Sequence, residues 1–223
     1  MTAAGRTVLL AGATSPSGLA IAKALVAAGA RVIAVGRDRA RLDALAGAVG
    51  SGSVRIEQAS LTDEAEVAAL AARLDAAGEH IDGVVPLVGG WRGGGGLAGQ
   101  SEQDYRALES SFTTVRLVSR AFDAALRASD AGRFAILSST AVARPLAGGA
   151  NYAAVKAASE TWTRAVAQGF AKAARDAGEP LRAAALVLRV RSLDDVIDEV
   201  AARIVALWDE DPTLLNDRIV DVV

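Results

Sequence analysis

The chain of 223 residues contains no cysteine and a single histidine, His80. Without thiols it cannot form a disulfide framework, a cysteine nucleophile or a thiolate metal site, and one imidazole cannot build a histidine-ligated cluster. The sequence therefore predicts no metal centre. Lysine and arginine together number 24 against 26 acidic residues, for a net charge of −2, and no basic stripe would follow a phosphate backbone. The charge pattern gives no support for a nucleic-acid partner.

Long hydrophobic runs are also missing. No segment reaches the ~18 to 20 uninterrupted apolar residues that a membrane span requires. Polar residues such as Arg6 and Lys23 interrupt the apolar N-terminal part, so we expect no membrane partner and a soluble, cytoplasmic protein. Aromatic residues make up only 4% of the chain although 52% is hydrophobic, because alanine and valine are abundant. Such small side chains suit helices packed closely on a buried sheet.

The chain does contain short apolar runs that alternate with helical segments. Strand-like runs lie at 7–11, 31–36, 53–59, 83–88, 133–139, 181–190 and 217–223. Segments with helical spacing or caps lie at 18–30, 39–49, 63–77, 101–128, from 148 onward, and at 193–208. This alternation indicates right-handed crossovers and a parallel sheet covered on both faces. We expect one α/β domain over residues 1–223, a doubly wound, Rossmann-like parallel sheet of seven strands with helices on both faces.

The turn after the first run, AGATSPSGLA, places Gly12 at the end of a strand and Gly18 at the start of a helix. Small residues there let the backbone approach a ligand closely, and the positive end of the helix dipole favours a phosphate. The hydroxyls of Thr14, Ser15 and Ser17 add donors. The alternative is a tight turn that only reverses the chain. The position after the first strand favours a dinucleotide site.

The end of the second strand is where such folds distinguish NAD from NADP. An acidic residue there accepts from the ribose hydroxyls, whereas a basic residue pairs with a 2′-phosphate. Arg37 follows that strand and favours NADP, with Arg39 and Arg41 as additional cations. Asp38 acts against this preference, and a solvated arginine at the start of a helix is the alternative, so NAD stays open as the cofactor.

Tyr152 and Lys156 stand four residues apart, on one face of a predicted helix. A tyrosine with a pKa near 10 is a poor base at neutral pH, unless a nearby cation stabilises its phenolate. Such a phenol can give a proton to a carbonyl oxygen as hydride arrives, or take one from an alcohol. By itself the pair is more typical of a helix surface. Ser139, thirteen residues earlier at the carboxyl edge of the sheet, could hydrogen-bond the same substrate oxygen.

With these motifs the sequence resembles the short-chain dehydrogenase/reductase family over nearly its whole length. The resemblance rests on the phosphate turn, the strand that ends in serine, and the spacing from that serine to Y-x-x-x-K. It implies that Ser139 polarises the substrate and Tyr152 is the acid/base. It implies that Lys156 lowers the tyrosine pKa and holds the nicotinamide ribose. It also implies a homodimer or homotetramer paired through the fourth and fifth helices.

Several cofactor positions depart from the family pattern. Pro16 replaces a glycine of the phosphate turn and removes one amide donor, so neighbouring residues must hold the pyrophosphate. Ser60, beside Leu61, replaces the acidic residue near the adenine. The family's N-N-A-G after the fourth strand is PLVG here, in which Gly89 is the remaining cofactor contact.

The substrate side departs further. Ser111 stands where the family has an asparagine that supports a proton-relay water, and a serine could still hold one. The helical lid that follows the sixth strand in the family is nearly absent. Trp91 and Arg92, in the glycine-rich stretch Gly89–Gly99, are the candidates to cover an apolar substrate face and to meet an anion. A mobile surface loop is the alternative for this stretch.

We therefore expect an NADP-preferring oxidoreductase that interconverts a carbonyl and an alcohol on an unidentified small molecule. Ser139, Tyr152 and Lys156 carry the reaction, with Ser111 as their support. The altered turn, Ser111 and the missing lid leave open a non-catalytic NAD(P)-binding regulator or sensor. A nicotinamide-dependent epimerase or dehydratase ranks last, because it would usually need a longer C-terminal substrate region.

Overall fold

The computed structural model describes residues 3–50 and 52–222. Within them, seven parallel strands form one sheet in the order β3-β2-β1-β4-β5-β6-β7. The strands are β1 (Thr7–Ala11), β2 (Arg31–Gly36), β3 (Val54–Gln58), β4 (Gly83–Pro86), β5 (Arg133–Ser139), β6 (Ala184–Val190) and β7 (Ile219–Asp221). The direction of winding reverses between β1 and β4, and ligands of open α/β sheets bind in the crevice at such a reversal.

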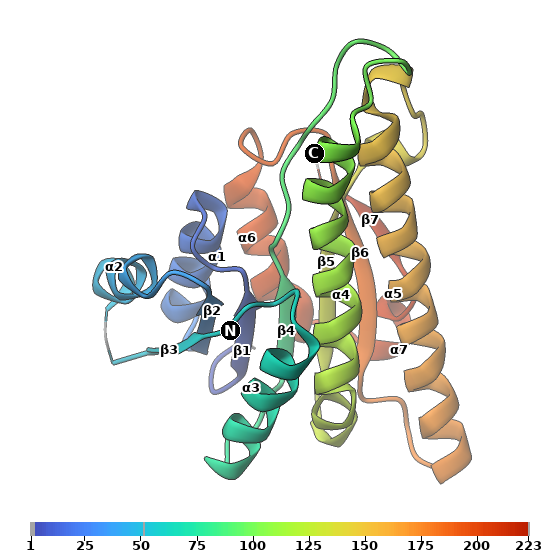
Figure 1. Ribbon diagram of the computed structural model, residues 1–223. Helices are drawn as coiled ribbons and strands as arrows, with labels where there is room; N and C mark the ends of the chain where they lie inside the picture. The colour runs from blue at the N-terminus through green and yellow to red at the C-terminus, as the bar shows by residue number, and fades with distance from the viewer. Residues whose placement is uncertain (1–2, 51, 223) are drawn as a thin grey trace.

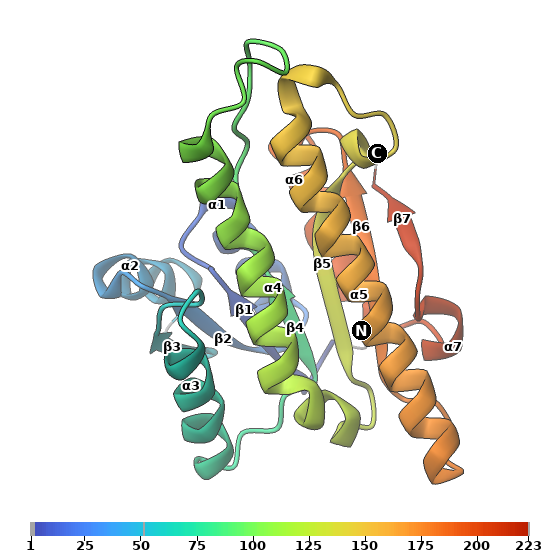
Figure 2. The ribbon, with the colours of Figure 1, turned by 45° about the vertical axis from the view of Figure 1, so that its right-hand side comes forward.

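Helices cover both faces of this sheet (Figure 1). One face carries α1 (Pro16–Ala27), α2 (Arg39–Val49) and α6 (Ile197–Val205). The other carries α3 (Glu64–Ala76), α4 (Glu102–Ala128) and α5 (Ala150–Ala177). Figure 2 shows α4 and α5 side by side in front of the strands. The predicted doubly wound, Rossmann-like sheet with helices on both faces is confirmed.

Each face of the sheet has its own apolar core. Successive residues of a strand point to opposite faces, so Val8 and Leu10 pack toward α1 and α6 while Leu9 and Ala11 pack toward α3 and α4. All four side chains are fully buried. Strands that are buried on both sides read as continuous apolar runs, which is why their positions were visible in the sequence.

Two predicted helix starts are confirmed by their caps. The Asp63 carboxylate accepts a hydrogen bond from the Glu66 amide at 3.0 Å, and the Ser101 hydroxyl accepts one from the Asp104 amide at 3.1 Å. Such caps satisfy amides that the first helical turn leaves without partners. None of the described helices has the length and apolar character needed to cross a bilayer.

Several predicted ends are wrong. Strand β6 begins at Ala184 rather than Leu181, because its partner β5 begins only at Arg133, the residue level with Ala184. Helix α6 begins at Ile197, after a turn, and the segment from Ala206 to Trp208 is a 3-10 helix. A short helix, α7 (Pro212–Leu215), was not predicted. The last predicted strand extended to Val223, which lies outside the described residues.

Candidate active site

A cavity of about 1210 Å³ lies at the carboxyl end of the sheet. The turn after β1 contributes Ser15 and Ser17 to its lining. The last residue of β5 contributes Ser139, and the first turns of α5 contribute Tyr152 and Lys156. Because the strands are parallel, the loops that follow β1, β4, β5 and β6 meet at this one edge. The volume is large enough for a sizeable organic ligand.

Tyr152 and Lys156 lie together on the first turns of α5. The Nζ atom of Lys156 is 5.7 Å from the centre of the Tyr152 ring and donates a 2.8 Å hydrogen bond to the carbonyl oxygen of Leu137 in β5. Burial lowers the pKa of Lys156 to about 8, while the charge of Glu160 acts in the opposite direction. The charge of this lysine therefore titrates close to neutral pH, unlike that of a surface lysine.

Ser139 ends β5 beside the tyrosine. Burial raises the pKa of Tyr152, and a hydrogen bond with the Ser139 hydroxyl offsets part of that rise. Ser139 is itself buried, and its Oγ accepts a hydrogen bond from the Ala141 amide at 3.2 Å. The resemblance implied that Lys156 lowers the pKa of the tyrosine, whereas in the structure burial is the largest influence and the pKa is raised. Tyr152 is therefore a neutral phenol, the form that can donate a proton.

Beyond Lys156 lies a buried ionic group that was not predicted from the sequence. Glu160, one turn further along α5, accepts a hydrogen bond from Ser138 Oγ at 2.6 Å and two from the Arg189 guanidinium at 2.8 and 2.6 Å. The strand register places Ser138 of β5 level with Arg189 of β6. These contacts fasten the ends of both strands to the helix that carries Tyr152 and Lys156. The four-residue spacing from Lys156 to Glu160 was the one signal available in the sequence.

The turn after β1 is built for close backbone approach. A Cβ atom at Gly18 would lie 2.1 Å from the carbonyl oxygen of Ala13, and one at Gly12 would lie 2.6 Å from the side chain of Val88, just after β4. Gly12 also has a φ of +98°, which favours glycine. Ser15 Oγ accepts a 3.1 Å hydrogen bond from the Gly18 amide and lies 3.0 Å from Ser17 Oγ. The turn therefore presents its backbone, two serine hydroxyls and the ring of Pro16 to the cavity.

Other predicted cofactor residues lie along the same edge but outside the cavity lining. Thr14 follows β1, and its methyl group packs close to the backbone of Gly36 at the end of β2. Ser60 and Leu61 follow β3. Leu61 is buried, and the Ser60 amide donates a 2.7 Å hydrogen bond to the Glu66 carboxylate. The structure thus brings these residues to the ends of β1 and β3, the two strands that flank β2.

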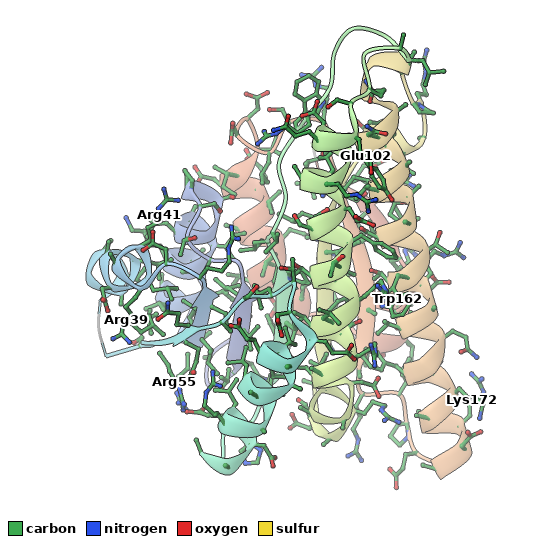
Figure 3. All side chains as sticks on the ribbon, viewed as in Figure 1. Arg39, Arg41, Arg55, Glu102, Trp162 and Lys172 are labelled. Carbon is green, nitrogen blue, oxygen red and sulfur yellow. The ribbon has the colours of Figure 1, made fainter. Side chains whose placement is uncertain are left out.

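The arginines after β2 differ in their partners. Arg39 lies 3.1 Å from Asp43, and Arg41 lies 3.5 Å from Asp38; both arginines are exposed, on different sides of α2 (Figure 3). Arg37 is exposed and forms no ion pair with any residue in the described ranges. Of the three predicted cations, Arg37 is the one whose guanidinium has no acidic partner among the residues that the structure describes.

Gly89 lies between Ser111 and Lys156. A Cβ atom built on Gly89 would lie 3.9 Å from Lys156 Nζ and 3.9 Å from Ser111 Cβ. Ser111 is buried on α4, and its hydroxyl donates a 2.7 Å hydrogen bond to the carbonyl oxygen of Leu108. Gly89 is therefore a neighbour of both residues, and the hydroxyl proton of Ser111 is used within its own helix.

The glycine-rich loop between β4 and α4 lies beside the start of α5, as Figures 1 and 2 both show. The Gly94 amide donates to the Gly148 carbonyl at 2.7 Å. The side chain of Gln100 donates to the same carbonyl at 3.0 Å and accepts from the Asn151 amide at 3.1 Å. A Cβ atom at Gly93 would lie 2.4 Å from the Gly148 oxygen. Glycine is therefore needed at position 93 for the close approach of the two loops.

The two predicted substrate residues of this loop have different positions. Trp91 lines the cavity and is 61% exposed. Arg92 is not among the lining residues, since its guanidinium donates to the Trp91 carbonyl at 3.1 Å and lies 4.0 Å from Asp104. Only residues 191–196 separate β6 from α6, so this connection places no helical lid over the cavity.

Comparisons with known sequences agree with this geometry. Residues 6–174 match the family model described as short chain dehydrogenase. An uncharacterized oxidoreductase of Staphylococcus haemolyticus is 34% identical over 85 residues, which cover 38% of this chain and 37% of the relative. The chain thus spans little more than a third of the length of that curated relative.

Solved structures share the fold along the whole chain. A short-chain dehydrogenase/reductase from Mycobacterium ulcerans matches with a TM-score of 0.83 at 19% identity, over 100% of this chain and 90% of the other. A metagenomic short-chain oxidoreductase in complex with NADP matches with a TM-score of 0.83 at 24% identity, over 100% and 99%. A short-chain dehydrogenase/reductase from Brucella melitensis matches with a TM-score of 0.81 at 23% identity, over 98% of this chain and 95% of the other. With the family model matching more than half of its residues, the chain belongs to the short chain dehydrogenase family, whose members are NAD(P)-dependent oxidoreductases.

Proposed function

We propose that the protein is an NADP-preferring oxidoreductase that interconverts a carbonyl and an alcohol on a small molecule. The observation that carries this proposal is that Ser139, Tyr152 and Lys156 line one cavity together with the serines of the turn after β1. Membership of the family supports the general class of reaction. We also propose that the whole chain acts as one domain, because both layers of helices pack on a single sheet.

The residues around the cavity fit a nicotinamide dinucleotide. The cradle at Gly12 and Gly18 is one that a Cβ atom would fill, and it adjoins the N-terminus of α1, where the helix dipole favours phosphate. Ser15 and Ser17 would hold the pyrophosphate, and Lys156 would hold the nicotinamide ribose. When bound, the dinucleotide supplies or accepts the hydride.

Arg37 supports NADP over NAD. Arg37 follows β2 directly, and its guanidinium has no acidic partner in the described ranges, so a 2′-phosphate would supply the anion with which it pairs. The NADP complex of the metagenomic relative, which has the same fold, is consistent with this preference. Thr14, Ser60 and Leu61 would border the adenosine half along the ends of the neighbouring strands.

In this mechanism Tyr152 moves the proton. Because burial favours its neutral phenol, Tyr152 can donate a proton to the substrate oxygen during reduction, while Ser139 donates a hydrogen bond to the same oxygen. In the reverse direction the phenolate takes the proton of the alcohol, and the positive charge of Lys156 stabilises it. Ser111, which lies near Lys156 across Gly89, would hold a water that returns the proton.

We propose a homodimer or homotetramer formed through the outer faces of α4 and α5. Trp162 on α5 (Figure 3) meets Phe112 on α4 edge to face, with ring centres 6.2 Å apart. The Arg116 guanidinium lies 5.8 Å from the Phe112 ring and 5.5 Å from the Trp162 ring. All three side chains stay partly exposed, as residues at a subunit interface would. Light scattering of the purified protein measures the oligomeric state directly, and a monomer would contradict this part of the proposal.

The proposed reaction is tested by cofactor binding followed by turnover. NADPH and NADH are titrated by fluorescence, and we expect tighter binding of NADPH. The loaded protein is then mixed with a panel of aldehydes and ketones, and oxidation of NADPH by at least one of them is expected. Tight binding without oxidation across the panel would instead favour an NAD(P)-binding regulator or sensor.

A further inference from the structure

Two arginines that line the cavity have no part in the proposed proton transfer. Arg144 lies in the loop after β5, five residues beyond Ser139, and Arg191 follows directly after β6. Both side chains are exposed. Neither guanidinium lies within 4.0 Å of a carboxylate oxygen of any residue that the structure describes, although many other arginines of the chain form such ion pairs. Guanidinium groups of this kind are always charged and carry donors in a planar fork.

The charges around the cavity do not balance. Its charged lining residues are Arg144, Lys156, Arg191 and a single acid, Asp194. The lysine is already engaged by the Leu137 carbonyl and the tyrosine ring. Two cations therefore face one carboxylate, and a ligand with negative charge would restore the balance.

The strand order indicates which ligand the arginines meet. The turn proposed to hold the pyrophosphate follows β1, whereas β5 and β6 lie two and three strands away, roughly 10 and 14 Å at the usual strand spacing. The register places Val190, immediately before Arg191, level with Ser139. Arg144 and Arg191 thus begin on the Ser139 side of the cavity, where the substrate reacts, and not beside the phosphate turn.

Apolar side chains complete the same region. Trp91 and Leu146 both line the cavity, and the loops that carry them are joined by the hydrogen bond between Gly94 and Gly148. Leu193 lies two residues after Arg191 and also lines the cavity. The substrate end therefore combines an apolar wall with a cationic rim.

From this arrangement we infer that the substrate is an anionic carbonyl compound. Its carbonyl group meets Ser139 and Tyr152, and its carboxylate or phosphate group meets Arg144 and Arg191 through charge-assisted hydrogen bonds. Reduction adds a hydride and one proton to the carbonyl, giving a hydroxy acid or hydroxy phosphate whose anionic group is unchanged. This inference rests on the proposed function and adds the substrate class to it.

The test compares matched pairs of carbonyl compounds that differ in charge. Oxidation of NADPH is measured with 4-oxobutanoate against its methyl ester, and with glyceraldehyde 3-phosphate against glyceraldehyde. Because a hydrogen bond to a charged group contributes ~1.5–3 kcal/mol, the anionic member of at least one pair should have a kcat/KM roughly 10- to 100-fold higher. The pair that shows the preference distinguishes a carboxylate substrate from a phosphate.

The double variant Arg144→Gln/Arg191→Gln should bring the ratio within that pair to about one. Arg175→Gln is the matched control, because this exposed arginine lies in the last turn of α5, roughly 35 Å along the helix from Tyr152. The control should keep the preference. Equal turnover of both members by the unmodified protein, or a preference that persists in the double variant, would overturn the inference.

Two further measurements separate this inference from the function on which it rests. If the double variant loses NADPH affinity in a fluorescence titration but keeps its preference between substrates, the arginines hold the cofactor and the inference fails. If no compound is reduced, the proposed function fails instead. Calorimetric titration of the NADP-loaded protein with butanedioate then still decides the binding site. Butanedioate binding that is lost in the double variant supports the inference, whereas no binding to the unmodified protein overturns it.

Discussion

Replacing Glu160 with glutamine should destabilise the protein strongly, although the change is one of charge and not of size. The side chains of Arg189 and Glu160 are only 18% and 6% exposed, and their shortest contact is 2.6 Å. Removing one partner of a buried ion pair costs ~3–5 kcal/mol, because the other charge stays buried without compensation. The glutamine oxygen can still accept from Ser138, so we expect a loss of about 2–4 kcal/mol in the free energy of unfolding.

Urea unfolding followed by circular dichroism measures this loss, and a shift in Tm of roughly 2–4 °C per kcal/mol should accompany it. Glu179→Gln is the matched control. Glu179 pairs with Arg182 at 3.3 Å, but the two side chains are 60% and 53% exposed, so its loss should cost at most about 0.5 kcal/mol. If the two variants are equally stable, the buried pair does not hold the ends of β5 and β6 as argued.

The same substitution should also change the pH dependence of the reaction. Glu160 acts against the burial that lowers the pKa of Lys156 to about 8, so removing its charge should lower that pKa further. The charged lysine is the active form, and the decline of kcat/KM toward high pH should therefore begin at a lower pH in Glu160→Gln. A purely structural role would reduce activity without moving this decline.

Three further outcomes follow from the site. In the unmodified protein, kcat/KM for reduction should fall as pH rises through about 8, where Lys156 loses its proton, and Lys156→Arg should remove that decline because arginine stays charged. Gly18→Ala places a methyl group 2.1 Å from the carbonyl oxygen of Ala13, so it should destabilise the protein by ~1–3 kcal/mol in urea unfolding and weaken NADPH binding. The control Gly47→Ala, in α2 with open space around it, should instead stabilise the protein by ~0.5–1 kcal/mol. Arg37→Gln should reduce the preference for NADPH over NADH by roughly tenfold in fluorescence titrations, and an unchanged ratio would remove Arg37 from the 2′-phosphate site.

The parts of the fold that were predictable are those whose signals are local. Strands β1, β2 and β5 match the predicted residues, because strands buried on both faces appear as apolar runs. Helix α4 begins directly after its predicted cap, Ser101. The start of β6 was not predictable, because it depends on where β5 begins, 51 residues earlier in the chain. Helix α7 was missed although Asp211 before Pro212 is a recognisable helix start.

The site divides in the same way. Tyr152 and Lys156 could be placed together from helical spacing alone, and the strand pattern placed Ser139 at the same edge. The contact between Glu160 and Arg189 could not be predicted, since it depends on the register of β5 and β6 and on the packing of α5 against both. The raised pKa of Tyr152 was missed for a related reason, because it depends on burial by the surrounding fold.

The proton transfer assigned to Tyr152 is tested most directly by the variant Tyr152→Phe, which keeps the ring and removes only the hydroxyl. NADPH-loaded protein is mixed with a carbonyl substrate in a stopped-flow instrument, and the loss of NADPH absorbance reports hydride transfer in a single turnover. We predict that the variant still binds NADPH and that transfer slows by roughly 10²- to 10⁴-fold, the usual contribution of a positioned proton donor. Transfer at the rate of the unmodified protein would contradict the role given to Tyr152.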